Sequence, residues 1–516
     1  MGRRWLAIAG LVCLFGGLSR AEVQLHPLFA DHAVLQRDTA VKVWGSATPG
    51  ERVVVQFAGQ ERSAEAGPDG KWRVELPATP AGGPYTLVVR GSSNTVEARD
   101  VLVGEVWVAS GQSNMHMPVK PNEPWSSGVL NHEQEIASAN WPQIRHIEVE
   151  RAFADAPAET MKGKWTVCSP QTVGNYSATA YFFARKLHQE LNVPVGIVMS
   201  AVGSTAAAAW TSRDALVRDP EMKARLDQYD QRVKSYPQDL ANFEARNPSA
   251  KANDPRRPKD PRQSIGWPAL LFNGMIAPLM PSTIRGVIWY QGEGNSQRPD
   301  TYANTMTTLI TDWRTRWGQG DFPFLFVQLT AHGAEIDQPA DANWARLREQ
   351  QAKTLAVPNT GMAVTIDVGS STTSHPPNKQ AIGDRLARVA LAKVYANRIA
   401  CFGPMFRSMK VEGDAIRIEF DHADGGLKSA EGVLKGFAIA GEDRKFIWAD
   451  ARIDGNAIVV SAGGVSKPVA ARYGWAENPK CNLFNGEGLP ASPFRTDDWP
   501  STVQKKAATA ATQATE

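Results

Sequence analysis

The most informative segment of the chain is Val101-Leu102-Val103-Gly104-Glu105-Val106-Trp107-Val108-Ala109, which continues directly as Ser110-Gly111-Gln112-Ser113-Asn114-Met115. The apolar run has the length of a buried strand, and the glycine after it favours a turn. Ser113 is thus expected on a turn at the end of a strand, where a nucleophile can be presented. The Gly-x-Ser-x-Gly elbow of α/β-hydrolases is absent, because Met115 stands at the position of its last glycine. The turn therefore differs from that of the α/β-hydrolases.

Apolar segments of strand length recur in the middle of the chain and alternate with segments of helical spacing. The expected strands cover residues 101–109, 195–200, 286–290, 324–329 and 361–366. Helices are expected over Ser177–Leu191 and after His375, where apolar residues recur every three or four positions. Strands that alternate with helices typically form a parallel sheet covered by helices. Residues 101–402 are therefore predicted to be an α/β catalytic domain.

Two β-rich segments are expected to flank this domain in the chain of 516 residues. Short alternating strands separated by turns predict a β-sandwich-like domain over residues 22–100 and a second β domain over 403–499. Residues 212–262 are charged and rich in proline, with acids among the basic residues. This pattern favours a solvated insertion over a patch that binds acidic polymers. Residues 500–516 are predicted to be a disordered tail.

The first 21 residues have the composition of a secretory signal peptide. Arg3 and Arg4 precede an apolar stretch, and small residues flank Arg20 where a signal peptidase would cut. An uncleaved anchor is the alternative, but the stretch is shorter than the roughly 20 residues needed to span a bilayer. Cleavage removes three arginines and no acid, so the formal charge falls from +3 to 0. We expect a secreted or periplasmic protein with no membrane span after cleavage and no nucleic-acid partner.

Three cysteines remain after this cleavage, namely Cys168, Cys401 and Cys481. An odd number permits one disulfide at most. Their wide spacing does not match a structural zinc site, and the histidines have no metal-binding spacing. Neither a metal nor a cofactor is expected.

Segments that follow the expected strands supply the groups that acyl transfer needs. In an open parallel sheet, the loops at the carboxyl ends of the strands converge on one crevice. Ser113 would attack an ester carbonyl, and His375 would take its proton and return it to the departing alcohol. The expected oxyanion donors are the backbone N–H groups of Ser113 and Gly203 and the side-chain amide of Gln291. Each residue alone is more often structural, so the hypothesis rests on their joint order along the chain.

Longer motifs around these residues resemble the sialate O-acetylesterase family, secreted carbohydrate esterases of the SGNH hydrolase superfamily. The matching segments extend over nearly the whole mature chain and are Leu28-Phe29, Val34-Leu35-Gln36-Arg37, Gly111–Met115, Asn273–Leu279, Trp289–Glu293, Arg472–Trp475 and Cys481–Asn485. The resemblance implies a flavodoxin-like parallel sheet and cofactor-independent deacetylation of O-acetylated sugars. It also implies that Ser113 is the nucleophile, His375 the base, and Gly203 and Gln291 oxyanion donors.

The chain departs from the family pattern beside the expected base. The family usually has an aspartate two residues before the histidine, whereas this chain has Thr373. In serine proteases, loss of the triad aspartate lowers turnover by about 10,000-fold, because the imidazole is no longer oriented. Asp367 is a candidate surrogate, although it could instead brace the loop. A backbone carbonyl could also accept the second N–H of His375, and Asn114 and Glu293 are expected to support the site.

Three further departures lie near the other motifs. Ser204 replaces the second glycine of the family's Gly-Gly-Thr motif. His116 and Ala208 stand where the family often has acidic residues. These positions do not carry the expected chemistry themselves, but they adjoin residues that do.

The leading hypothesis is a secreted carbohydrate O-acetylesterase, similar to sialate 9-O-acetylesterases, whose partner is an O-acetylated sugar or polysaccharide. An acetyl xylan or xyloglucan esterase of the same fold is the alternative substrate class. A carbohydrate-binding homologue with weak catalysis is the main rival from another class, motivated by Thr373 and Ala208. A protease or lipase is a third and weaker hypothesis, because no motif suggests a lipid-sized acyl pocket.

Overall fold

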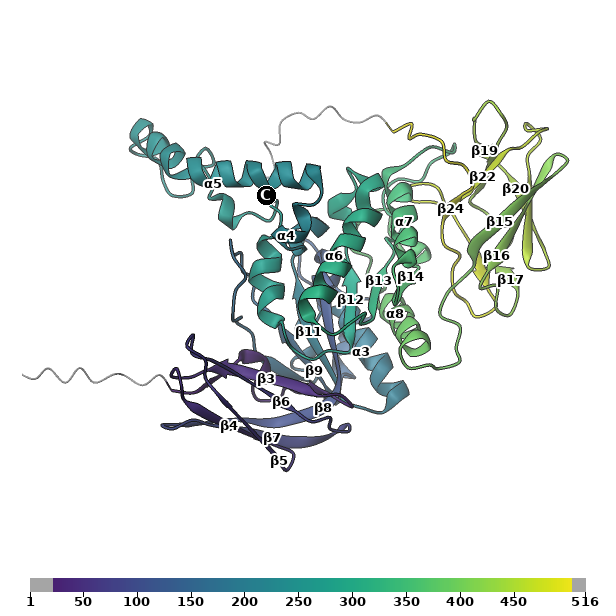
Figure 1. Cartoon of the computed structure of the whole chain (residues 1–516). Coiled ribbons are helices and arrows are strands. Elements are labelled where there is room, and N and C mark those ends of the chain that lie inside the picture. Colours follow the sequence, from purple (N-terminus) through teal and green to yellow (C-terminus); the bar gives the residue numbers. More distant parts are fainter. Residues whose placement is uncertain (1–21, 504–516) are drawn as a thin grey trace, which may run out of the picture.

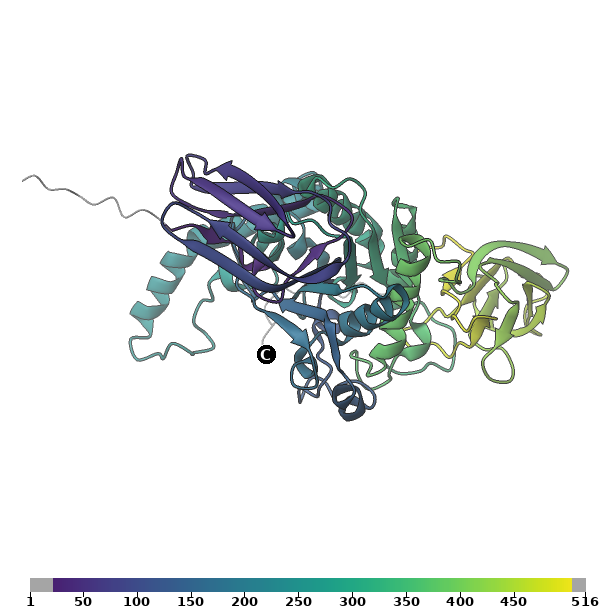
Figure 2. The same cartoon turned by 90° about the horizontal axis from the view of Figure 1, so that it is seen from below.

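The structure, a computed structural model, describes residues 22–503. A central α/β domain carries an N-terminal β domain beneath it and a C-terminal β domain at its side (Figures 1 and 2). The expected signal peptide, residues 1–21, and residues 504–516 of the expected tail lie outside the described residues. Among the residues that are described, no helix has both the length and the apolar character needed to cross a membrane.

The central sheet has the flavodoxin-like strand order. Its core consists of β11 (Val195–Ala201), β8 (Thr95–Gly111), β12 (Gly286–Tyr290), β13 (Phe324–Val327) and β14 (Thr360–Ala363), in this order across the sheet. All neighbours in this set are parallel. Numbered along the chain, the order is 2-1-3-4-5, and ligands bind where it reverses, between the first and third strands. These are β8 and β12, and the predicted fold class is confirmed.

Two strands at one edge of this sheet were not predicted. β9 (Trp141–Glu148) lies parallel to β11, and β10 (Trp165–Cys168) lies antiparallel to β9, so the sheet is mixed. Polar residues interrupt β9 and hide its strand pattern. Two of them are nevertheless buried: Arg145 donates hydrogen bonds to Asp100, and His146 stacks on Tyr176 with ring centroids 4.4 Å apart.

Helices cover both faces of the sheet. α3 (Ala178–Leu191) and α8 (Lys379–Lys393) pack against each other, and Ser177 caps α3 by accepting a hydrogen bond from the N–H of Ala180. α6 (Tyr302–Trp317) and α7 (Asn343–Lys353) form a second pair. Right-handed crossovers put this second pair on the opposite face. Every residue of β11 and β12 is buried, as expected for parallel strands that are covered on both sides.

The N-terminal β domain shares a strand with the catalytic domain. It contains β1 (Gln24–Leu25), β2 (Val34–Gln36), β3 (Val41–Ser46), β4 (Arg52–Phe57), β5 (Gln60–Glu65), β6 (Lys71–Leu76) and β7 (Gly82–Arg90). The first half of β8 pairs with β7 and β2, and its second half pairs with β11 and β12. The predicted boundary at residue 100 therefore falls inside one continuous strand of 17 residues.

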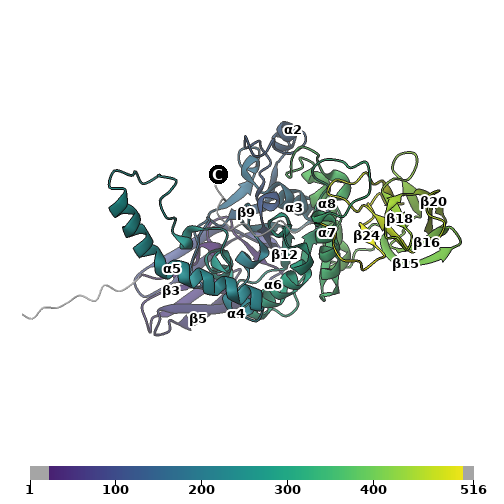
Figure 3. The same cartoon turned by 90° about the horizontal axis from the view of Figure 1, so that it is seen from above.

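The predicted insertion forms two helices on the outside of the catalytic domain. α4 (Arg213–Leu216) is followed by α5 (Pro220–Arg246), which projects away from the rest of the molecule (Figures 1 and 3). Asp219 caps α5, and only Leu226 and Tyr229 of this helix are buried. A small helix, α2 (His132–Ala137), lies outside the insertion.

The C-terminal domain has its own small core between antiparallel sheets. One sheet contains β15 (Met405–Glu412), β16 (Ala415–Asp421), β21 (Ala457–Ser461) and β20 (Asp450–Asp454). Another contains β19 (Ile447–Trp448), β18 (Phe437–Ala440), β22 (Ala470–Tyr473) and β24 (Phe494–Arg495), and β17 (Leu427–Ser429) pairs with β23 (Leu483–Asn485). Cys168, Cys401 and Cys481 are all free in the structure.

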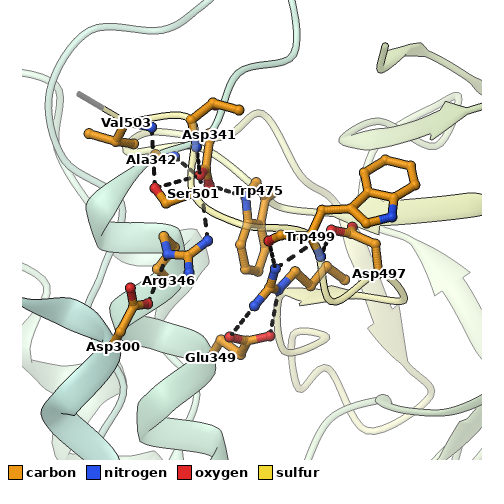
Figure 4. A network of polar contacts seen from close by, with 12 residues as sticks. Asp300, Asp341, Ala342, Arg346, Glu349, Trp475, Asp497, Trp499, Ser501 and Val503 are labelled. Atoms are coloured by element: carbon orange, nitrogen blue, oxygen red, sulfur yellow. Dashed lines mark hydrogen bonds and ion pairs between the residues drawn. The ribbon is translucent and has the colours of Figure 1, made fainter. Parts of the chain in front are cut away.

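Polar contacts fasten the end of the described chain to α7 and to the loop before it (Figure 4). Arg495 forms two hydrogen bonds with Glu349 of α7, at 2.7 and 3.1 Å. Asp341 accepts hydrogen bonds from the hydroxyl of Ser501 and the N–H of Thr502. The prediction that disorder begins at residue 500 is therefore wrong for these positions, because Asp341 satisfies their polar groups.

Candidate active site

The expected nucleophile lies on a tight turn between β8 and the short helix α1 (Ser113–His116). Gly111 has a φ of 135°, and a Cβ there would lie 2.2 Å from the carbonyl oxygen of Tyr290. Only glycine permits this close approach of the two strands. The N–H of Gln112 donates to the same oxygen at 3.0 Å. These contacts hold the turn in place and leave Ser113 half-buried and accessible.

Gly203 lies beside the nucleophile, at the end of the neighbouring strand β11. A Cβ on Gly203 would be 3.4 Å from the Cβ of Ser113. Within residues 22–503, neither the N–H of Ser113 nor that of Gly203 donates a hydrogen bond. Unpaired backbone donors beside a serine are suited to bind a developing oxyanion. Ser204, at the position of the family's second glycine, has a φ of 62°, which explains why glycine is usual there.

Asn114 joins the three motif segments. Its Nδ2 atom donates to the Oε1 atom of Glu293 at 2.6 Å and to the carbonyl oxygen of Ser374 at 2.8 Å. Its Oδ1 atom accepts a hydrogen bond of 2.6 Å from the Nζ atom of Lys379, at the start of α8. The nucleophile turn, the loop after β12 and the histidine loop are therefore connected through one buried side chain.

Glu293 and Lys379 place opposite charges on either side of this asparagine. Burial raises the pKa of Glu293 and lowers the pKa of Lys379 to about 7. Glu293 and Lys379 oppose these shifts in each other, because each favours the charged form of its neighbour. The Oε2 atom of Glu293 has no hydrogen-bond partner among the described residues. The Nζ atom of Lys379 lies 5.5 Å from the ring centroid of Tyr290.

His375 lies in a pocket that favours its neutral form. Burial, followed by the nearby charges of Lys379 and His332, lowers the pKa of His375 to about 4. The backbone of Trp125 acts in the opposite direction and favours the protonated imidazole. The indole of Trp125 also meets the imidazole edge to face, with centroids 5.3 Å apart. A neutral imidazole can accept a proton, as a general base must.

Thr373 and Asp367 do not contact the imidazole in the way that the family aspartate would. The Oγ1 atom of Thr373 accepts a hydrogen bond from the backbone N–H of His375 at 3.0 Å, which shapes the loop. Asp367 forms two hydrogen bonds with Arg385 of α8, at 2.6 and 2.7 Å. The expectation that Asp367 replaces the aspartate is corrected by this ion pair, since both carboxylate oxygens are engaged in bracing the loop.

The expectation that the side chain of Gln291 donates to the oxyanion is also corrected. Its side chain is completely buried, and its Nε2 atom donates to the carbonyl oxygen of Thr205 at 3.0 Å and to the Oδ1 atom of Asn295 at 2.8 Å. Its Oε1 atom accepts a hydrogen bond from the hydroxyl of Tyr302. All its hydrogen-bonding groups are used inside the protein, so Gln291 holds the loop after β12.

Two residues of the site were missed by sequence reasoning. Lys379 had a detectable signal, because it lies three residues before Ile382 and seven before Leu386, on the buried face of α8. No sequence signal identifies Trp125, because it acts through its backbone and lies in a loop without a motif. His116 of α1 also lies within hydrogen-bond distance of Glu148, with 3.2 Å between Nε2 and Oε1.

The family model for carbohydrate esterases described as sialic acid-specific acetylesterases matches residues 103–245 and 270–392. The chain belongs to this family. The two matched segments contain all the residues of the site described above. The interruption between them, residues 246–269, overlaps the end of the predicted insertion 212–262.

Whole-chain relatives of this esterase agree with the family match. The sialate O-acetylesterase of Mus musculus is 28% identical, with 90% of this chain and 92% of that protein covered. The sialate O-acetylesterase of Homo sapiens is 27% identical, with 89% and 90% covered. The crystal structure of a carbohydrate acetylesterase from Xanthomonas citri is 37% identical, covers 92% of this chain and 100% of that chain, and has a TM-score of 0.80. The protein is thus a carbohydrate acetylesterase, an ester hydrolase similar to sialate O-acetylesterases.

Proposed function

We propose that Ser113 and His375 carry out ester hydrolysis in two steps. The Oγ atom of Ser113 forms a bond to the acetyl carbonyl carbon while His375 takes the hydroxyl proton. His375 then gives this proton to the sugar oxygen as the bond between that oxygen and the carbonyl carbon breaks. Water, activated by the same imidazole, releases acetate from the serine. The low pKa of His375 supports this role, since the base is neutral at physiological pH.

The observation that carries the proposal is the pair of unpaired backbone donors beside Ser113. The N–H groups of Ser113 and Gly203 make no hydrogen bond within the described part of the chain, although Gly203 is close enough for its Cβ position to lie 3.4 Å from that of Ser113. In this proposal both donate to the oxyanion of the tetrahedral intermediate. Each such donor contributes about 100- to 1,000-fold to turnover in enzymes of this type.

The backbone of Trp125 takes the orienting role that an aspartate has in most triads. In this proposal the carbonyl oxygen of Trp125, whose backbone favours the protonated form of His375, accepts a hydrogen bond from one ring nitrogen and leaves the other for Ser113. A neutral carbonyl stabilises the imidazolium less than a carboxylate does. We therefore expect turnover to be slower than in an enzyme with a full triad. Glu293 acts as a positioning residue through Asn114 and is not the partner of His375.

The proposed substrates are acetyl esters on sugars outside the cytoplasm. O-acetylated sialic acids are proposed from the names of the relatives, and position 9 from the family resemblance. Acetylated xylan or xyloglucan is the alternative polysaccharide class. Secretion or a periplasmic location follows from the composition of residues 1–21. A weakly catalytic carbohydrate-binding protein remains the rival, because Thr373 stands in place of the aspartate.

Acetate release from O-acetylated sialic acid and from acetylated xylan tests the proposal. We expect the mature protein to release acetate from one of them and Ser113→Ala to release none, while both keep the same melting temperature. Activity of Ser113→Ala equal to that of the parent protein would exclude Ser113 as the nucleophile. If both are inactive and Thr373→Asp gains activity, the carbohydrate-binding alternative takes its place.

A further inference from the structure

A cavity lies where the C-terminal β domain meets the catalytic domain, separate from the residues of the active site. Its volume is about 560 Å³, within the range of small-ligand sites. One wall is residues 339–341 of the loop after β13, and another is residues 444–448 around the start of β19. Gly436, Ala438, Arg472, Trp475 and residues 499–502 complete the lining, so segments from both domains enclose the cavity.

The floor of this cavity is a rigid stack of rings and guanidinium groups. Arg444 lies 5.3 Å from the ring centroid of Trp499, and the ring of Trp499 is 5.5 Å from that of Phe446. Arg472 lies 4.0 Å from the centroid of Phe446 and 5.2 Å from that of Trp475. The ring faces and the guanidinium groups of this stack therefore cover one another. The stack therefore gives the cavity its shape and does not itself offer a stacking surface.

Hydrogen bonds of Asp341 hold the cavity wall formed by residues 339–341 in place. The Oδ1 atom of Asp341 accepts a hydrogen bond of 3.0 Å from the indole N–H of Trp475 (Figure 4). Its Oδ2 atom accepts from Ser501 and Thr502, which belong to the last described segment. Arg346 of α7 lies 3.5 Å from the same oxygen. The cavity is thus largely formed before any ligand binds, which lowers the entropic cost of binding.

Trp448 supplies the open aromatic surface of the cavity. It is 39% exposed, although large aromatic side chains are usually covered. Its indole N–H donates to the carbonyl oxygen of Asp337 at 2.8 Å, so the ring cannot turn freely. Arg444 and Lys445 beside it are exposed and have no acidic partner among residues 22–503. An apolar face next to unpaired donors matches a sugar ring, which has apolar C–H faces and a rim of hydroxyl groups.

The loop that forms one cavity wall also reaches the active site. His332 lies near the start of this loop, contacts the carbonyl oxygen of Ser370 at 3.2 Å and influences the charge of His375. From His332 to Ala340 the chain can span at most about 30 Å, even when fully extended. The cavity lining contains none of the active-site residues, and this limit keeps its wall within reach of an oligosaccharide chain that extends from the region of His332.

We propose that this cavity binds a sugar unit of an acetylated polysaccharide while another unit of the same chain presents its acetyl group to Ser113. The unit stacks on Trp448, and Lys445 donates hydrogen bonds to its hydroxyl groups. This inference rests on the proposed function and selects the polymeric substrate class from the two considered there. A monomeric sugar ester would gain nothing from the cavity.

The test uses the mature full-length protein in two assays. On a Ser113→Ala background, titration calorimetry with xylohexaose measures binding, and we expect Trp448→Ala and Lys445→Ala each to weaken it at least fivefold. With Ser113 intact, we expect Trp448→Ala to lower kcat/KM on acetylated xylan by a similar factor. Its kcat/KM on 4-nitrophenyl acetate, which is too small to reach the cavity, should equal that of the parent protein.

A second variant and a control keep this test decisive if Trp448→Ala is unstable. Ala340→Trp fills the cavity from an exposed wall position and should reproduce the loss on xylan only. Ile453→Ala removes another exposed apolar side chain of the same domain, outside the cavity, and should change neither assay. Unchanged xylohexaose binding in both Trp448→Ala and Ala340→Trp would overturn the cavity proposal. Acetyl release by Ser113→Ala would instead overturn the proposed function and leave the binding result to stand alone.

Discussion

The Nζ atom of Lys379 lies 2.6 Å from the Oδ1 atom of Asn114, across 265 positions of sequence. The same asparagine donates through Nδ2 to Glu293 and to the backbone just before His375. A single amide therefore sets how the nucleophile turn and the histidine loop lie relative to each other.

Replacement of Asn114 should damage both stability and catalysis. Asn114→Ala leaves the buried Lys379 and Glu293 without their shared partner, and unmade buried hydrogen bonds to charged groups cost about 3 kcal/mol. We expect a lower melting temperature by calorimetry and a fall in kcat larger than the change in KM, because the histidine loop loses its anchor. Asn140→Ala, at an exposed position, is the matched control. An Asn114→Ala enzyme with unchanged kcat would show that the loop is positioned by other contacts.

The rate should be insensitive to pH until the solution is strongly acidic. His375 acts as a base only when neutral, and its pKa is lowered to about 4, so kcat/KM should be level at neutral pH and fall as the pH drops through that value. Thr373→Asp places a carboxylate near the imidazole and should move this acidic limb to higher pH. Asp367→Asn should not move it, since Asp367 is paired with Arg385. A pH profile of kcat/KM for the parent protein and the two variants shows whether a carboxylate at position 373 or at position 367 acts on the imidazole.

Gln291 should matter for stability and not as an oxyanion donor. Gln291→Leu removes the hydrogen bond to the buried carbonyl oxygen of Thr205 and one of the hydrogen bonds of Asn295 and of Tyr302, at a cost of about 1 to 3 kcal/mol. We expect a clearly lower melting temperature and, well below it, a kcat within about tenfold of the parent enzyme. The opposite pattern, an unchanged melting temperature with a 100- to 1,000-fold loss of kcat, is what a lost oxyanion donor would produce.

A methyl group at Gly203 should separate folding from catalysis. The new Cβ would lie 3.4 Å from the Cβ of Ser113, at ordinary contact distance, so Gly203→Ala should fold with nearly the same stability. The methyl group would crowd the space in which the oxyanion forms, and we expect kcat to fall at least tenfold with little change in melting temperature. Gly318→Ala, at a position with open space but a φ of 66°, should do the reverse and affect stability only.

The sequence was sufficient to predict the sheet and the turns that carry Ser113, Gly203 and His375. Continuous apolar runs such as β11 and β12 are unmistakable because both faces of these strands are buried. β9 was missed because its buried polar residues depend on partners such as Asp100, which lie elsewhere in the chain. The same limit applies to the site, since Gln291 and Asp367 have residue types suited to catalysis and only their contacts show that they brace loops. Trp125 acts through a backbone group that every residue possesses, so residue type could not identify it.

The 17-residue strand β8 has a consequence for how this enzyme can change over evolution. Domains joined by a flexible linker can be exchanged or lost by recombination at the linker. Here one continuous strand joins the N-terminal β domain to the nucleophile turn. A break within this strand would expose unpaired backbone groups of a sheet on each side. In this chain, removal of the N-terminal domain would therefore cut the strand that presents Ser113.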